Sequence, residues 1–292
     1  VLASLIFILT GSVVHAAEDP VNCTATGTIT LSTQAHVDNF QSRYGPCDTT
    51  PFGLSITGDN ITNLSGLADL KTVRGNLDIT DAYYLNNYSG LANLQAIEGR
   101  LRISESGWSN RFSSTYQIDM ASLVSIGGDL DVSGTKTDRL TSMQFPVLES
   151  LGGSINFNEV PNLSSILLPV LTSVPGTLRI NAVPIKNVDS FSNITTIGGD
   201  LTIANSSQLR QLDGFASVTA IGGNALLSNN DSMVDLHGLA ALGVITGSLS
   251  IEGNAALRAC GGVFTVLNAS QVGGEISIAN NNTGCQSVDD VL

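Results

Sequence analysis

Gly75-Asn76-Leu77-Asp78-Ile79 and Gly199-Asp200-Leu201-Thr202-Ile203 share one pattern, a glycine and a polar residue before an apolar, polar, apolar triplet. With changes, the pattern occurs eleven times, at steps of 23 to 29 residues. A repeat of this period indicates a solenoid in which each copy packs on the next, and not the two domains that a length of 292 residues suggests. The leading apolar residues are Ile29, Leu54, Leu77, Leu101, Leu130, Ile155, Leu178, Leu201, Ala225, Leu249 and Ile276.

Two periodicities within each repeat predict its shape. The apolar, polar, apolar triplet predicts a short strand with one buried face. Between strands an apolar residue recurs at every third position, as in Ile185, Val188, Phe191, Ile194 and Ile197. A period of three fits neither a helix nor one strand, but it fits a coil that turns corners and sends one side chain inward at each short edge. The sequence therefore predicts an all-β solenoid, a β-helix of about eleven rungs.

The N-terminal part of the chain differs from the repeats. Residues 1–17 form an apolar run that ends in small residues, which is typical of a signal peptide and shorter than the about 20 residues of a membrane span. Thr33 is a candidate N-cap, and Val37, Phe40 and Tyr44 follow at helical spacing. We expect a capping helix within residues 18–53, repeats over 54–258 and a C-terminal cap over 259–292. We also expect the sequence to be incomplete at both ends, which leaves room for an anchor beyond Leu292.

Four cysteines flank the repeats, two near each end of the chain. In an exported protein they are expected to form disulfides, and four cysteines allow three connectivities. The local pairing, Cys23 with Cys47 and Cys260 with Cys285, is favoured because the long array separates the two pairs. A metal site is not expected, because the chain has no C-x-x-C motif and few histidines. No cofactor is expected either.

Asn-x-Ser/Thr sequons are about twice as frequent as chance predicts. They indicate a glycosylated secretory protein, although a chain rich in asparagine and serine also produces sequons by accident. The ten candidate glycosylation sites are Asn22, Asn60, Asn63, Asn87, Asn162, Asn193, Asn205, Asn230, Asn268 and Asn281.

The stretches Cys23–Leu31, Ser125–Val132, Leu167–Val174 and Leu212–Gly223 carry a resemblance to a known family. They resemble the receptor L-domain superfamily, and most of all its fungal GPI-anchored proteins of cell-wall organisation, the extracellular-matrix and sporulation-specific type. The resemblance covers about residues 22–285. It implies a right-handed single-stranded β-helix, a non-enzymatic role at the cell surface, and a GPI anchor, whose stalk and tail the sequence does not contain.

The charge balance narrows the class of partner. The chain has 12 basic and 25 acidic residues, a net charge of −13, and 42% hydrophobic residues. The acidic excess argues against nucleic-acid binding, which needs surplus lysine and arginine, and the apolar content argues against disorder. The partners expected are a cell-wall polysaccharide or a surface protein, and contact with a membrane is expected only through the missing anchor.

One charged cluster stands on three successive repeats of an otherwise small and polar face. Its members are Asp78, Arg100, Arg102, Asp129 and Asp131. One interpretation is the active site of a β-helix polysaccharide lyase or hydrolase, which uses such carboxylates. The favoured interpretation is structural: cross-strand ion pairs Asp78–Arg102–Asp131 and Arg100–Asp129, each contributing about 0.2–1 kcal/mol.

A second cluster is aromatic and lies in the segments after the third and fourth strands, where the longest repeat step falls. Loops of irregular length on a regular scaffold often carry function, and tyrosine, tryptophan and arginine dominate binding hot spots. Packing of these side chains onto the solenoid is an equally good explanation. The candidate binding residues are Tyr83, Tyr84, Tyr88, Trp108, Arg111 and Tyr116.

The leading hypothesis is a secreted, non-enzymatic cell-surface or cell-wall protein with a binding or structural role in wall organisation or adhesion. A carbohydrate-active β-helix enzyme and the ligand-binding ectodomain of a receptor are the alternatives. The sequence shows no nucleophile elbow, phosphate-binding loop or zinc-protease motif.

Overall fold

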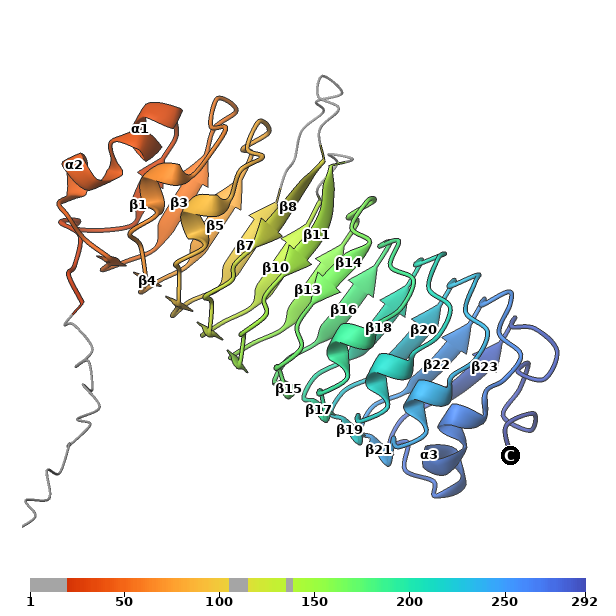
Figure 1. The fold of residues 1–292 in the computed structure, drawn as a ribbon. Coiled ribbons are helices and arrows are strands. Elements are labelled where there is room, and N and C mark those ends of the chain that lie inside the picture. The colour runs from red at the N-terminus through yellow and green to blue at the C-terminus, as the bar shows by residue number, and fades with distance from the viewer. Residues whose placement is uncertain (1–19, 105–114, 135–138) are drawn as a thin grey trace, which may run out of the picture.

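The computed structural model describes residues 20–104, 115–134 and 139–292. One parallel sheet of eleven strands runs the length of an elongated coil (Figure 1). Its strands begin at the eleven leading apolar residues of the repeat. In spatial order they are β1 (Ile29–Leu31), β3 (Leu54–Thr57), β5 (Leu77–Thr80), β7 (Leu101–Ser104), β10 (Leu130–Ser133), β13 (Ile155–Asn158), β16 (Leu178–Asn181), β18 (Leu201–Ala204), β20 (Ala225–Ser228), β22 (Leu249–Glu252) and β23 (Ile276–Ala279).

Shorter parallel sheets form another side of the coil, from two-residue strands that lie just before the long strands in the sequence. A five-stranded sheet contains β12 (Ser150–Leu151), β9 (Ser125–Ile126), β6 (Ala96–Ile97), β4 (Thr72–Val73) and β2 (Thr49–Thr50). A four-stranded sheet contains β15 (Ser173–Val174), β17 (Thr196–Ile197), β19 (Ala220–Ile221) and β21 (Val244–Ile245).

The third side of the coil changes character along the molecule. Six repeats carry a single 3-10 turn there, and three central repeats carry a strand instead. The turns are η1 (Ser65–Leu67), η2 (Ser89–Leu91), η3 (Asp189–Phe191), η4 (Asp213–Phe215), η5 (His237–Leu239) and η6 (Gly261–Val263). The strands are β14 (Ser165–Leu167), β11 (Leu140–Gln144) and β8 (Tyr116–Asp119).

The strand alternation predicted from the sequence is confirmed. In β7, Leu101 and Ile103 are buried and Arg102 is half-exposed, and the register places Leu101 beside Leu77 and Leu130. The period of three is also confirmed, since Val188, Phe191 and Ile194 are buried. Stacked apolar side chains therefore fill the coil, and each contributes about 1.5–3 kcal/mol through burial.

Glycine is required where neighbouring turns approach most closely. A Cβ at Gly152 would lie 2.0 Å from the carbonyl oxygen of Gly127 in the preceding repeat, and a Cβ at Gly238 would lie 1.8 Å from that of Leu212. Any larger residue at either position would push two backbones apart. The glycines of the repeat thus allow its turns to stack at the spacing of a β-sheet.

Short helices and a disulfide mark each end of the coil. The segment predicted as one N-terminal helix forms two, α1 (Gln34–Asp38) and α2 (Phe40–Tyr44), which meet at Asn39. The Thr33 hydroxyl accepts a hydrogen bond from the His36 backbone N–H, as its N-cap role predicts. At the other end, α3 spans Phe264–Asn268.

Both predicted disulfides are present, Cys23–Cys47 and Cys260–Cys285. In the described part of the chain, no helix combines the length and the apolar character that crossing a membrane requires.

Candidate ligand-binding surfaces

The charged cluster lies on the outward face of the eleven-stranded sheet, and its residues pair with one another. The Arg100 Nε lies 3.0 Å from the Asp78 Oδ1, and this hydrogen bond raises the pKa of Arg100 above its ordinary value. The Arg102 Nε lies 3.6 Å from the Oδ2 of Asp131, its register partner on β10, as predicted. Its other register partner, Asp78 on β5, pairs with Arg100 instead. The predicted pair of Arg100 with Asp129 is wrong, because Arg100 pairs with Asp78 one strand away.

Asp129 has a different role, which it shares with a column of polar residues just before the long strands. Its Oδ1 accepts a hydrogen bond from the backbone N–H of Ser154 in the next repeat, at 2.7 Å. In the same way the Thr177 backbone N–H donates to the Ser154 Oγ, and the Asp200 backbone N–H donates to the Thr177 Oγ1. The series continues through Asn224, Ser248 and Glu275. These side chains link successive turns of the coil.

These contacts favour the structural interpretation of the cluster. Asp78 holds Arg100, Asp129 accepts a backbone N–H, and Asp131 contacts Arg102 and accepts a 2.7 Å hydrogen bond from the Asn156 Nδ2. Among the described residues, no group of three or more His, Cys, Asp or Glu side chains is placed to share a metal ion. Each carboxylate of the cluster is thus engaged in joining neighbouring strands.

The tyrosines predicted to bind a ligand are divided between the core and the surface. Tyr88 and Tyr116 are only 3% and 4% exposed, and their rings stack with centroids 5.6 Å apart. The prediction that these two bind a ligand is therefore wrong, because their rings pack inside the coil. The guanidinium of Arg139, itself buried, lies 5.4 Å from the Tyr116 ring centroid.

Tyr83 and Tyr84 are half-buried, and the Tyr83 hydroxyl donates a hydrogen bond to Asp81. These two rings still reach the surface. Trp108 and Arg111 lie outside the described residues.

Two of the ten predicted glycosylation sites are also internal. Asn230 and Asn281 are 0% and 8% exposed. Their Nδ2 atoms, to which a glycan would be attached, donate hydrogen bonds to the carbonyl oxygens of Ile203 and Ile251. The folded chain has no room for a glycan there, so the prediction is wrong for these two asparagines. The other eight are exposed or half-exposed.

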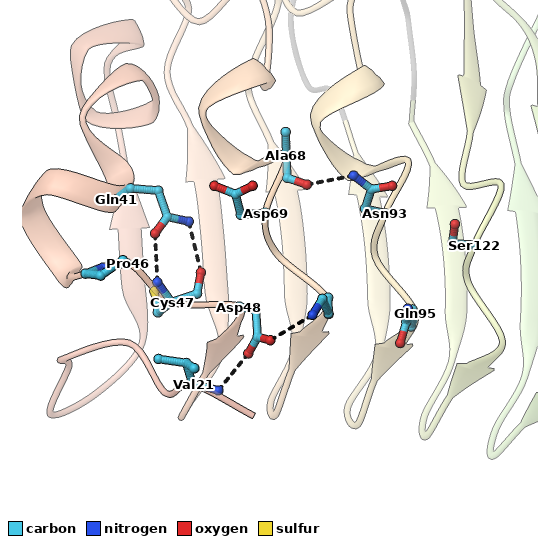
Figure 2. Close-up of a pocket in the computed structure, with 11 residues that line it drawn as sticks. Val21, Gln41, Pro46, Cys47, Asp48, Ala68, Asp69, Asn93, Gln95 and Ser122 are labelled. Carbon is cyan, nitrogen blue, oxygen red and sulfur yellow. Dashed lines mark hydrogen bonds and ion pairs between the residues drawn. The ribbon is translucent and has the colours of Figure 1, made fainter. Parts of the chain in front are cut away.

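A pocket of about 460 Å³ lies at the N-terminal end of the coil, between the turns that follow η1 and η2 and the short strands β2, β4 and β6 (Figure 2). Sequence reasoning missed it. Its lining residues are Val21, Gln41, Pro46, Cys47, Asp48, Ala68, Asp69, Lys71, Asn93, Gln95 and Ser122.

Side-chain hydrogen bonds fix one wall of this N-terminal pocket. The Gln41 Nε2 donates to the Cys47 carbonyl oxygen, and the Gln41 Oε1 accepts from the Cys47 N–H (Figure 2). The Asp48 carboxylate accepts from the Val21 N–H and lies 3.3 Å from the Lys71 Nζ. Burial raises the pKa of Asp48, but hydrogen bonds from Thr49, Lys71 and Val21 outweigh it, so the net pKa lies below the ordinary value.

The spacing of the repeat could have revealed this pocket. Asp69, Asn93 and Ser122 each stand eight residues before the leading residue of a long strand. Asp48, Lys71 and Gln95 each stand six residues before one. The two rows face outward on the side of the short strands. In the sequence, only the positions next to the long strands were compared between repeats, so these rows were missed.

Residues 172–257 match the family model of the receptor L domain. This stretch contains the four long strands β16, β18, β20 and β22 of the sheet that carries the charged cluster. A search of the curated proteins gave no match. The receptor L-domain match and the two disulfides fit an extracellular domain.

Proposed function

We propose that this chain is a non-catalytic, extracellular ligand-binding module that acts at a cell surface or cell wall. The outward face of the eleven-stranded sheet is the proposed ligand surface. The receptor L-domain match over residues 172–257 supports a binding role, and disulfides at both ends support an exported protein.

The position of the sequons carries this proposal. None of the ten sequon asparagines lies in the eleven long strands or directly before one. The same face nevertheless carries Asn76, Asn156, Asn158, Asn181 and Asn224, none of which begins a sequon. Asn205 directly follows β18, and its Nδ2 donates to the Asn181 Oδ1, so a glycan there would stand at the edge of this face. Glycans on the other seven accessible sequons would lie outside the long strands and leave the outward face open. A surface kept free of bulky, solvated glycans is available to a partner.

The chemistry of this sheet face suits a polar partner. Its strands repeat at about 4.8 Å, so its side chains form a flat, regular array. Paired charges at its centre favour electrostatic complementarity over a buried apolar contact. Arg179 is exposed at the centre, with a 3.4 Å hydrogen bond to Asn158. A cell-wall polysaccharide or a surface protein fits this description.

The finer proposal, a wall-anchored protein of the fungal cell-wall organisation type, depends on sequence beyond Leu292. A Ser/Thr-rich stalk with an apolar tail encoded there would support a GPI anchor. A membrane span followed by a cytoplasmic domain would instead favour a receptor ectodomain.

Binding by the purified, glycosylated protein tests the proposed function. We expect retention on β-glucan, chitin, mannoprotein or intact cell surfaces, and no released product. Arg179→Ala should weaken retention because it removes the exposed charge at the centre of the face. Lys186→Ala removes an equally exposed charge in a turn away from the face, and it should leave retention unchanged. Equal effects of the two variants would contradict the proposal.

A further inference from the structure

We propose that the N-terminal pocket is a second ligand site, which binds a neutral oligosaccharide of about three residues along the axis of the coil. This site is distinct from the outward face of the eleven-stranded sheet, and the proposal does not depend on that face being a ligand surface.

The pocket offers two rows of three polar side chains, which overlap as polar pairs in the two repeats that carry Asp69 with Lys71 and Asn93 with Gln95. Backbone hydrogen bonds of 2.7 Å from Lys71 to Asp48 and 2.8 Å from Gln95 to Lys71 place the repeats side by side. Neighbouring side chains of a row are therefore about 4.8 Å apart, close to the length of one pyranose residue in an extended glycan. The first row is Asp69, Asn93 and Ser122, and the second is Asp48, Lys71 and Gln95.

Several polar atoms in the pocket remain available to a ligand. Asp69 is exposed, and within the described residues its carboxylate and the Gln95 amide have no hydrogen-bond partner. Asn93 donates its Nδ2 to the Ala68 carbonyl oxygen, which leaves its Oδ1 as an acceptor (Figure 2). Sugar hydroxyls both donate and accept, so they match this mixture of carboxylate, amide and hydroxyl groups.

The wall opposite these atoms is held in place and partly apolar. Gln41 fixes the Cys47 backbone through two hydrogen bonds, and the disulfide ties Cys47 to Cys23. A wall fixed before binding lowers the entropic cost of binding. Val21 and Pro46 present carbon atoms beside it, which can contact the C–H faces of a sugar ring.

Charge and row composition restrict the ligand. Asp48 and Asp69 outnumber the single cation Lys71, so the pocket disfavours acidic sugars. Beside Ser122 the second row has Val124, and past Ser122 the first row continues with Val147 and Val170; these valines are 40%, 38% and 39% exposed. Each row therefore offers three polar side chains before a valine follows, which limits the hydrogen-bonded part of the ligand to the N-terminal end of the coil.

Titration calorimetry of the full chain with chitotriose and laminaritriose tests this site. We expect at least one of them to bind, and Asp69→Ala combined with Gln95→Ala to weaken binding by about tenfold or more. Ser217→Ala combined with Thr219→Ala changes the same two rows in the repeat that leads to Ala225, and it should have no effect.

Three results would overturn the proposal: no heat from either trisaccharide, equally tight binding of trigalacturonate, or equal weakening by the control pair. The sheet variant Arg179→Ala should leave the trisaccharide heats unchanged. A failure of this site is therefore distinguishable from a failure of the sheet surface.

Discussion

Asn254 is bonded to Asn230 of the preceding turn, inside the coil. The Asn254 Oδ1 accepts a hydrogen bond from the Asn230 backbone N–H at 2.9 Å, and the Asn254 Nδ2 donates to the Leu227 carbonyl oxygen at 2.9 Å. The ladder extends to Ser206 at one end and to Asn281 at the other. Since these groups are buried, each bond satisfies a polar atom that water cannot reach.

Removal of the Asn254 amide should therefore destabilise the fold. Asn254→Ala leaves the Asn230 N–H and the Leu227 carbonyl oxygen buried without partners, and we expect a loss of about 2–4 kcal/mol in the free energy of unfolding. Asn187→Ala is the control, because Asn187 is exposed and the loss of its amide leaves no buried polar group without a partner. Urea unfolding measures both. Equal losses in the two variants would contradict an internal role for the ladder.

Glycan occupancy should follow burial. We expect peptide mass spectrometry of protein secreted from a glycosylating host to find Asn230 and Asn281 unmodified. Exposed sequons such as Asn60 and Asn162 should be available for modification. A glycan on Asn230 in the folded, secreted protein would show that the ladder is not formed as described.

Asp48 should make stability depend on pH in the acid range. Its folded pKa lies below the ordinary value of 3.8, so its carboxylate stabilises the fold above that pH, and this contribution is lost as pH falls through the folded pKa. The difference in unfolding free energy between the parent chain and Asp48→Asn should shrink on acidification. Thermal unfolding from neutral pH to about pH 2 measures this difference. A difference that is constant with pH would contradict the lowered pKa.

The charged cluster should prove structural. Asp131→Ala removes a partially exposed pair with Arg102 and should cost about 0.2–1 kcal/mol. Neither the parent chain nor the Asp129→Ala and Asp131→Ala variants should release reducing ends or unsaturated products from acidic polysaccharides, with or without calcium. Product release that these substitutions abolish would instead establish the carbohydrate-active enzyme.

The periodicity of the sequence was enough to predict the strands and their faces, because burial of a repeated apolar position leaves little choice of register. The period of three also distinguished the tyrosines, and this signal was missed: Tyr88 continues the buried series of Leu85 and Leu91, whereas Tyr84 lies outside it. The ladder left a readable signal: Asn230, Asn254 and Asn281 each stand five residues after the leading residue of a strand. As sequons, two of these were interpreted as surface sites.

The pocket shows the same limit of sequence reasoning. Its polar rows come from the edge of the repeat that contains η1 and β4. No single residue of these rows indicates a binding site by its type alone. What brings Asp69 and Lys71 close to Gln95 is the stacking of turns, and that stacking depends on close backbone approach at glycines such as Gly90.

The central claim, that the ligand binds the outward face of the eleven-stranded sheet, is tested most directly by a glycan placed on that face. Leu226→Thr creates a sequon at Asn224, and Leu226→Val is the control without a sequon. Both proteins also carry Asp69→Ala and Gln95→Ala, so that the N-terminal pocket adds no retention. With both secreted from the same glycosylating host and occupancy of Asn224 verified, retention on the ligand is compared. Retention lost by about tenfold or more in the glycosylated variant alone is the predicted result. Full retention with a glycan on Asn224 would contradict the claim.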